Sequence, residues 1–146
     1  MQKRSLEKKE IEIRLDLYDG TVFPYKDNTF DKIVSSLVFH QLDKQTKNSC
    51  LNEIFRVLKP NGELIIGDWG EAKSKLMRIR FYIVQLLDGF KTTKDNVEGL
   101  IPNYMINAGF KNVEELSYIN TKIGSYCYYK GNKHYLANAI RIMRHT

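Results

Sequence analysis

The sequence predicts an α/β domain with a mainly parallel sheet and an antiparallel last strand. Two apolar runs with little polar interruption, "FDKIVSSLVF" (residues 30–39) and "ELIIGDW" (residues 63–69), are typical of buried strands. The segment between them has the spacing of an amphipathic helix. Two strand-like segments near the C-terminus, "KNVEELSYI" and "GSYCYYKG", are separated by a short turn and predict a closing hairpin.

The composition favours a single globular enzyme-sized domain that acts in the cytoplasm. The chain has 146 residues, of which 42% are hydrophobic and 27% charged, which is enough to bury a core. It has no apolar run long enough to span a bilayer, and the charged start "MQKRSLEKKE" lacks the apolar stretch of a secretion signal. Cys50 and Cys127 match no metal or redox spacing, so we expect reduced, buried thiols and no metal site.

The net charge of +6 is concentrated near the C-terminus. No Asp or Glu follows Glu115, whereas five basic residues do: Lys122, Lys130, Lys133, Arg141 and Arg144. Such a tail can contact nucleic acid or acidic lipid, but a charge run is more often a solvated helix face. We therefore expect no nucleic-acid function, and we divide the chain into a domain at residues 1–130 and a basic helix or tail at residues 131–146.

The first half of the chain predicts a strand, a loop, a strand and a helix in that order. Residues 11–17 alternate apolar and charged side chains, which is strand periodicity, and follow a charged, helix-compatible segment at residues 3–9. The loop at residues 18–29 is rich in turn formers. Asp43 is a suitable N-cap for a helix whose apolar face includes Leu58, and "KPNG" is expected to stop that helix.

The second half predicts two helices before the hairpin and one after it. A long helix is expected over residues 73–88, and a short helix over 102–108 that begins at Pro102 and is closed by Gly109. A last helix is expected over residues 133–144. In parallel α/β sheets, ligands bind at the C-terminal ends of the strands, so the residues that follow each strand are the candidates for function.

Three segments carry a resemblance to a known family. They are "DLYDGTVFPYKDNTFDKIVSSLVFHQL" from residue 16, "LNEIFRVLKPNGELIIGDWG" from residue 51, and "INAGFKNVEEL" from residue 106. In this order the chain resembles the class I S-adenosylmethionine-dependent methyltransferases, and more narrowly the small-molecule type called methyltransferase 11 or UbiE-like. The resemblance implies a Rossmann-like sheet, S-adenosylmethionine as cofactor, and transfer of its methyl group to a small-molecule acceptor.

The resemblance also implies which residues bind the adenine end of the cofactor. Asp19 corresponds to a carboxylate that accepts a hydrogen bond from the adenine amino group, which is a donor. Gly20 and Thr21 would bring the backbone close beneath the ring, where glycine offers no steric obstacle. Without the family context, the Asp-Gly pair is explained by turn chemistry alone.

Residues at the end of the next strand would line the rest of the cofactor. Ser35, Ser36 and Leu37 correspond to positions that contact the methionine half, largely through backbone groups. Phe39 could pack against the adenosine, although an ordinary core phenylalanine is almost as good an interpretation.

His40 is the candidate catalytic residue. It follows the strand at the cofactor end, where a histidine can remove a proton from a substrate hydroxyl or amine. The alternative is that it caps the following helix or bonds a loop. Asp68 and Trp69 hold the equivalent place after the next strand and are expected to line the pocket.

Two parts of the family pattern are missing from the sequence. No two glycines lie within two residues of each other, so the glycine-rich turn is absent, and so is the following acid that holds the ribose. The resemblance implies a strand order of 3-2-1-4-5-7-6, so we expect an N-terminally truncated sheet that lacks its first two strands. A gene fragment, a misassigned start codon or a split enzyme would each explain this.

The expected consequence is impaired activity in this chain. The alternative function is a non-catalytic fragment or interaction module, whose exposed strand edges pair with another chain that supplies the missing strands. A nicotinamide-dependent oxidoreductase would need the same missing glycine-rich turn and lacks the later segments of the family.

Overall fold

The computed structural model describes residues 16, 18, 22–71, 73, 79, 95, 98–122 and 124–134. Its elements, in order, are β1 (Phe30–Ser36), η1 (Phe39–Gln41), α1 (Lys44–Val57), β2 (Leu58–Trp69), α4 (Ile101–Asn107), β3 (Lys111–Asn120) and β4 (Ser125–Asn132). The segments predicted at 3–9, 11–17, 73–88 and 133–144 lie wholly or mostly outside these residues. Because β4 runs to Asn132, it passes the boundary predicted at residue 130, and the division into two domains stays a prediction.

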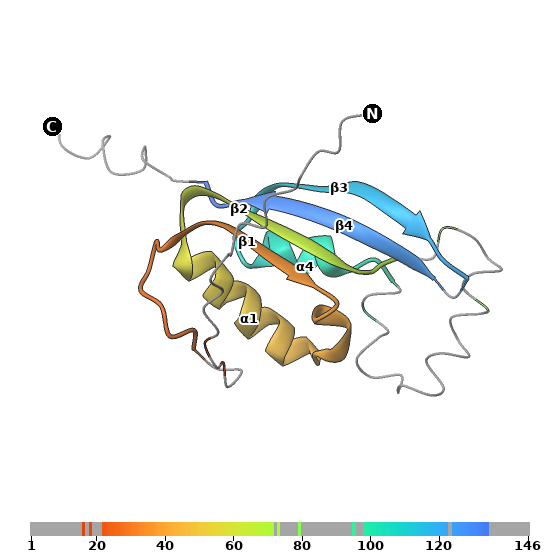
Figure 1. Cartoon of the computed structure of the whole chain (residues 1–146), viewed down its shortest axis with the longest axis horizontal. Helices are drawn as coiled ribbons and strands as arrows, with labels where there is room; N and C mark the ends of the chain where they lie inside the picture. The colour runs from red at the N-terminus through yellow and green to blue at the C-terminus, as the bar shows by residue number, and fades with distance from the viewer. Residues whose placement is uncertain are drawn as a thin grey trace, which may run out of the picture.

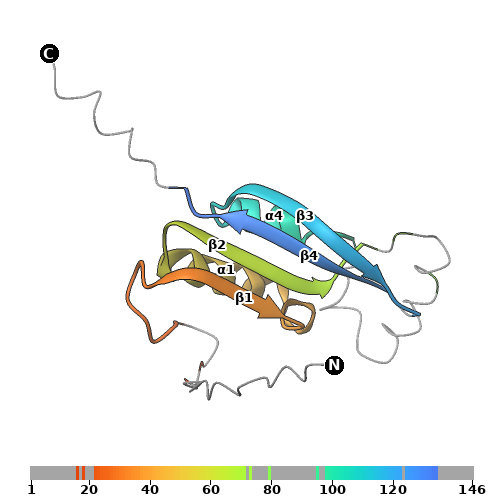
Figure 2. The ribbon, with the colours of Figure 1, turned by 45° about the horizontal axis from the view of Figure 1, so that its top comes forward.

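The described strands form one four-stranded sheet in the order β1-β2-β4-β3. β1 and β2 are parallel, whereas β4 is antiparallel to both β2 and β3. Figures 1 and 2 show α1 and α4 on one face of this sheet. The α/β class with an antiparallel closing hairpin is confirmed, and the order agrees with the 4-5-7-6 half of the order that the family resemblance implies.

Helix α1 begins as the sequence predicts. The Asp43 backbone is extended, and its carboxylate accepts a hydrogen bond from the Thr46 N–H at 2.7 Å, which satisfies a donor that the first turn leaves unpaired. This contact lowers the pKa of Asp43. The buried side chains of the helix include Leu51, Ile54 and Val57, so its apolar face packs on the sheet.

The end of α1 differs from the prediction. The helix stops at Val57, and Leu58 is extended and already paired with Phe30 in the sheet. The "KPNG" segment is an irregularity inside β2: the β1–β2 register shifts there, and Asn61 has a φ of 65°. The chain therefore changes from helix to strand before the proline. The reason is that Pro60 restricts Lys59 to extended conformations and allows no further helical turn.

The core lies between the sheet and the two helices. It includes Phe39, Leu51, Leu64, Ile66 and Met105, all 0% exposed. Both cysteines are free and buried within it, as predicted.

The short helix α4 also follows its prediction. Pro102 lies in its first turn, and Gly109, with a φ of 102°, follows its last turn. A side chain at Gly109 would meet the Phe55 ring, so glycine suits this position for its conformation and its size.

The sheet is covered unevenly in the part of the chain that the structure describes. Along β1, Ile33 packs against the core, while its neighbour Val34 is 65% exposed. This alternation follows the period of two along a strand. The buried strand predicted over residues 30–39 is therefore wrong: β1 ends at Ser36, and every one of its residues is at least partly exposed, because β1 lies at the edge of the described sheet. The described helices contact only one face, and β1 is the edge strand on its side.

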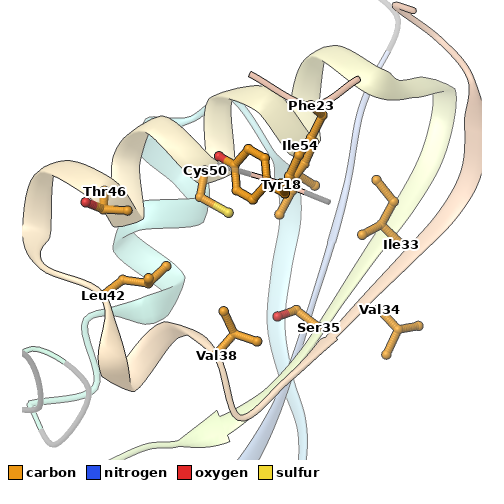
Figure 3. A pocket seen from close by; sticks show the side chains of 10 residues that line it. All are labelled: Tyr18, Phe23, Ile33, Val34, Ser35, Val38, Leu42, Thr46, Cys50 and Ile54. Carbon is orange, nitrogen blue, oxygen red and sulfur yellow. The ribbon is translucent and has the colours of Figure 1, made fainter. Parts of the chain in front are cut away.

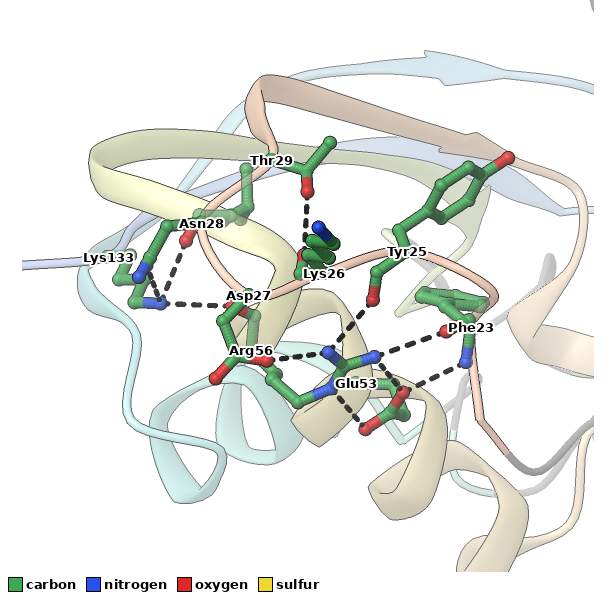
Figure 4. Close-up of polar contacts among 10 residues, drawn as sticks. Phe23, Tyr25, Lys26, Asp27, Asn28, Thr29, Glu53, Arg56 and Lys133 are labelled. Carbon is green, nitrogen blue, oxygen red and sulfur yellow. Dashed lines mark hydrogen bonds and ion pairs between the residues drawn. The ribbon is translucent and has the colours of Figure 1, made fainter.

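A cluster of polar contacts fastens the loop before β1 to helix α1 (Figure 4). The Arg56 guanidinium donates to the Phe23 and Tyr25 carbonyls at 3.2 and 3.0 Å and pairs with Asp27 at 2.6 Å. Glu53 accepts from the Phe23 N–H at 2.9 Å and pairs with Arg56 at 2.8 Å. These contacts raise the pKa of Arg56, lower that of Glu53, and fix the path by which the chain enters β1.

Two substitutions to alanine test whether the core lies on only one face of the described sheet. Leu51→Ala removes a fully buried side chain, and we expect it to lower the free energy of unfolding by about 2–5 kcal/mol. Val34→Ala should change it by less than about 0.5 kcal/mol, since Val34 faces outward from the edge strand. Denaturant unfolding measures both. If Val34→Ala lowered the free energy of unfolding as much as Leu51→Ala does, another segment would have to cover this face of the sheet.

Candidate functional site

The parallel pairing of β1 and β2 places their C-terminal ends side by side. Ser36 is paired with Gly67, and the Leu37 N–H donates to the Gly67 carbonyl at 2.9 Å, immediately before η1. The residues that follow the two strands therefore meet at one edge of the sheet, which is where ligands bind in α/β folds.

His40 and Asp68 are brought into direct contact by this arrangement. His40 Nδ1 lies 2.8 Å from Asp68 Oδ1, and the His40 N–H donates to Asp68 Oδ2 at 3.2 Å. The Asp68 side chain is 0% exposed, whereas that of His40 is 16% exposed. A buried carboxylate thus holds a histidine that still reaches the surface.

A second polar cluster lies close to this pair. Lys47, on α1, is 0% exposed, and its Nζ is 3.8 Å from Asp95 Oδ2. Tyr104 donates to the same Asp95 oxygen at 2.5 Å, and burial together with this bond raises the pKa of Tyr104 to about 12. Burial lowers the pKa of Lys47, and the carboxylates of Asp95 and Asp68 oppose that shift.

A pocket of about 510 Å³ lies on the α1 side of β1 (Figure 3). Ser35 and Val38 line it from the end of β1, and Thr46 and Cys50 line it from α1. The remaining lining side chains are mostly apolar: Tyr18, Phe23, Ile33, Val34, Leu42 and Ile54. Its size and apolar lining are those of small-molecule sites.

The predicted cofactor residues at the end of β1 and just after it lie in different environments. Ser35 lines the pocket, while the hydroxyl of Ser36 lies 2.8 Å from that of Tyr126 on β4. Leu37 is 46% exposed and has a φ of 56°, and Phe39 is 0% exposed within the core. Their roles toward the cofactor stay predictions.

The predicted adenine-binding residues Asp19, Gly20 and Thr21 lie outside the described residues. Their sequence neighbour Tyr18 lines the pocket and packs on Phe23, with ring centroids 4.4 Å apart.

The sequence pointed to His40 as a candidate but did not predict its contact with Asp68. Asp68 was expected only to line the pocket, and the available signal was its place near the C-terminal end of the neighbouring parallel strand. Among the residues that the structure describes, no group of three His, Cys, Asp or Glu side chains could hold a metal ion. No helix within those residues has the length and apolar character needed to cross a membrane.

Comparisons with known proteins agree with this geometry. Residues 1–66 match the family model described as a methyltransferase domain. The ubiquinone/menaquinone biosynthesis C-methyltransferase UbiE of Blochmanniella pennsylvanica is 29% identical over 133 residues, which cover 77% of this chain and 50% of that protein. The chain thus spans about half the length of this curated relative.

Solved structures share the fold. A SAM-dependent methyltransferase from Methanosarcina mazei aligns with a TM-score of 0.60 at 18% identity, over 82% of this chain and 66% of that one. A Haemonchus contortus phosphoethanolamine N-methyltransferase, solved with phosphomonomethylethanolamine and S-adenosylhomocysteine, aligns with a TM-score of 0.56 at 13% identity, over 77% of this chain and 36% of that one.

Residues 1–66 thus resemble the methyltransferase domain family, and the described sheet has the fold of S-adenosylmethionine-dependent methyltransferases. UbiE C-methyltransferases are among the curated proteins to which the chain is similar.

The buried Lys47 predicts a measurable pH dependence of stability. Its pKa is lowered in the folded protein, so above that value the unfolded chain binds more protons than the folded one. The stability of the wild type should therefore rise, relative to Lys47→Met, as pH increases from the lowered pKa toward the ordinary value of 10.5. Urea unfolding of both proteins at a series of alkaline pH values measures this difference. The prediction would be contradicted if the stability of the wild type relative to Lys47→Met stayed constant or fell as pH increases.

Proposed function

We propose that this chain takes part in methyl transfer from S-adenosylmethionine to a small-molecule acceptor, with His40 as general base. One observation carries the proposal: the pocket, which Ser35 and Val38 line, and the His40–Asp68 pair both lie at the C-terminal end of β1. In this proposal the cofactor and the group that accepts the proton would lie near the same strand end.

The pocket suits the adenosine part of the cofactor. Its mostly apolar walls would cover the faces of a flat ring, and the Ser35 and Thr46 hydroxyls offer a few polar contacts. Tyr18 lines the pocket and directly precedes Asp19, which we propose as the acceptor for the adenine amino group. We propose that Gly20, Thr21 and the backbone after Ser35 complete this wall.

His40 would act on the acceptor molecule. The bound cofactor supplies an electrophilic methyl group, and an acceptor that carries an O–H or N–H group becomes a better nucleophile once that proton is removed. The His40 ring is only 16% exposed and is anchored on one side by Asp68, which supports a fixed orientation toward such an acceptor.

We propose that cofactor binding by these 146 residues alone is weak. They contain no glycine-rich turn of the kind that holds the carboxypropyl end of the cofactor in the family. The adenosine contacts would remain, and a large share of the binding free energy would have to come from other groups.

A pair of variants on α1 tests the pocket. Titration of the ¹⁵N-labelled chain with S-adenosylhomocysteine should shift the amide signals of Ser35, Val38 and Cys50 at millimolar concentration, with little heat in calorimetry. Cys50→Phe should remove these shifts, because the Cys50 side chain points into the pocket (Figure 3). Asn52→Phe, on the exposed side of the same helix, should keep them.

Tight binding of S-adenosylhomocysteine in calorimetry would contradict the proposal that these residues alone bind the cofactor weakly. An absence of shifts at Ser35 and Val38 in the wild type would remove the pocket as the cofactor site. Thermal melts show whether each variant is folded.

A second candidate function is an interaction module, favoured by the edge position of β1. We propose that its outer edge pairs with a strand of another polypeptide, because Val34, Leu37 and Val38 are 65%, 46% and 43% exposed beside it. Exposed edge strands with apolar side chains promote such pairing.

Light scattering tests this second function without a known partner. If the edge of β1 pairs with other strands, the wild type should self-associate as its concentration rises. Val34→Lys should then lower the average molar mass in solution. Leu116→Lys, on the opposite edge strand β3, should have less effect. A stable monomer at high concentration would argue against this module.

A further inference from the structure

We infer that Asp68 is the positioning residue of His40: it holds the proton of the neutral imidazole on Nδ1, which leaves Nε2 as the atom that accepts a proton from the acceptor molecule. The tautomer follows from the geometry of this chain, and its catalytic consequence rests on the proposed function.

The bonding capacity of the two groups determines the tautomer. An ionised carboxylate only accepts hydrogen bonds, and Asp68 Oδ1 lies 2.8 Å from His40 Nδ1. At that distance Nδ1 must carry a hydrogen, because two lone pairs would repel each other. The neutral ring has only one N–H, so Nε2 keeps its lone pair.

Other contacts hold the Asp68 carboxylate in place. Besides the ring, it accepts the backbone N–H of His40 at 3.2 Å and that of Trp69 at 2.7 Å. The buried Lys47 ammonium lies close enough for the charge of Asp68 to affect its pKa. Because β2 is paired on both sides near its end, with β1 and β4, the carboxylate rests on a rigid support.

The other side of the ring agrees with this assignment. Gln41 Nε2 is 3.5 Å from His40 Nε2, and an amide nitrogen can only donate a hydrogen bond. This long contact is compatible with a ring that has a lone pair on Nε2. That nitrogen lies on the exposed side of the pair, where an acceptor molecule can approach.

This geometry indicates the chemical class of the acceptor: a molecule that must lose an O–H or N–H proton to become nucleophilic. The proton moves to Nε2, and the electron pair that it leaves forms the new bond to the methyl carbon. The cofactor, when bound, would supply this methyl group and would keep the electrons of the broken methyl–sulfur bond on its sulfur. The imidazolium that results faces the Asp68 carboxylate, which stabilises its charge.

Histidine-labelled NMR tests the tautomer without any substrate. In long-range ¹H–¹⁵N spectra of the ¹⁵N-histidine protein, above the pH at which the ring is protonated, we expect His40 to show a protonated Nδ1 and an unprotonated Nε2. His40→Gln identifies its signals. Asp68→Asn, whose amide can donate to Nδ1, should shift the ring toward the Nε2–H form.

Asp95→Asn is the matched control, since it changes a neighbouring, partly buried carboxylate that has no contact with His40 among the described hydrogen bonds. It should leave the tautomer unchanged. The inference would be overturned if the wild-type His40 ring carries its proton on Nε2, or if Asp68→Asn leaves the proton on Nδ1. The wild-type spectrum alone is a sufficient test if a variant is unstable.

Methyl transfer tests the catalytic consequence. In a preparation that transfers methyl groups, Asp68→Asn should lower kcat by roughly 10²–10⁴-fold with little change in KM, which is the range for loss of general-base catalysis. Adding it to His40→Gln should cause little further loss, because the two residues act as one unit. If no preparation is active but the tautomer is as expected, the proposed function fails while the positioning role of Asp68 stands.

Discussion

The parallel pairing of β1 with β2 is the constraint on which the rest of the structure depends. It aligns Ser36 with Gly67, so the chain leaves both strands at the same edge of the sheet. η1 then returns His40 over the end of β2, onto the carboxylate of Asp68. The pocket depends on the same pairing, because Ser35 and Val38 line it from the end of β1. A shift in this register would separate all of these groups.

Burial determines how the polar groups beneath this edge behave. Asp68 and Lys47 are both 0% exposed, so neither can rely on water to stabilise its charge. Backbone donors and His40 satisfy the carboxylate, and Asp95 lies near the ammonium. Such polar clusters favour a single arrangement of the elements that contribute to them, here α1, β2 and the segment before α4. The site is therefore held by the same interactions that order the core.

Several features were predictable because they depend on neighbours in the sequence. The Asp43 cap, the buried strand β2, the short helix closed by Gly109 and the final hairpin all follow from local patterns, and the structure confirms them. The end of α1 was predicted wrongly because the pairing of Leu58 with Phe30, which lies 28 positions earlier in the chain, competes with the helical pattern. Long-range pairing leaves no local signal of this kind.

The sequence by itself determined the fold class, the family resemblance and the choice of His40 as a candidate, since each rests on residue types at fixed spacing. Only the tertiary structure decided that Asp68 is the partner of His40, because the two are joined across neighbouring strands. It also separated Ser35, which lines the pocket, from Ser36, which bonds Tyr126 across the sheet. Ser35 and Ser36 point to opposite faces of the strand, and α1 packs against the face on which Ser35 lies.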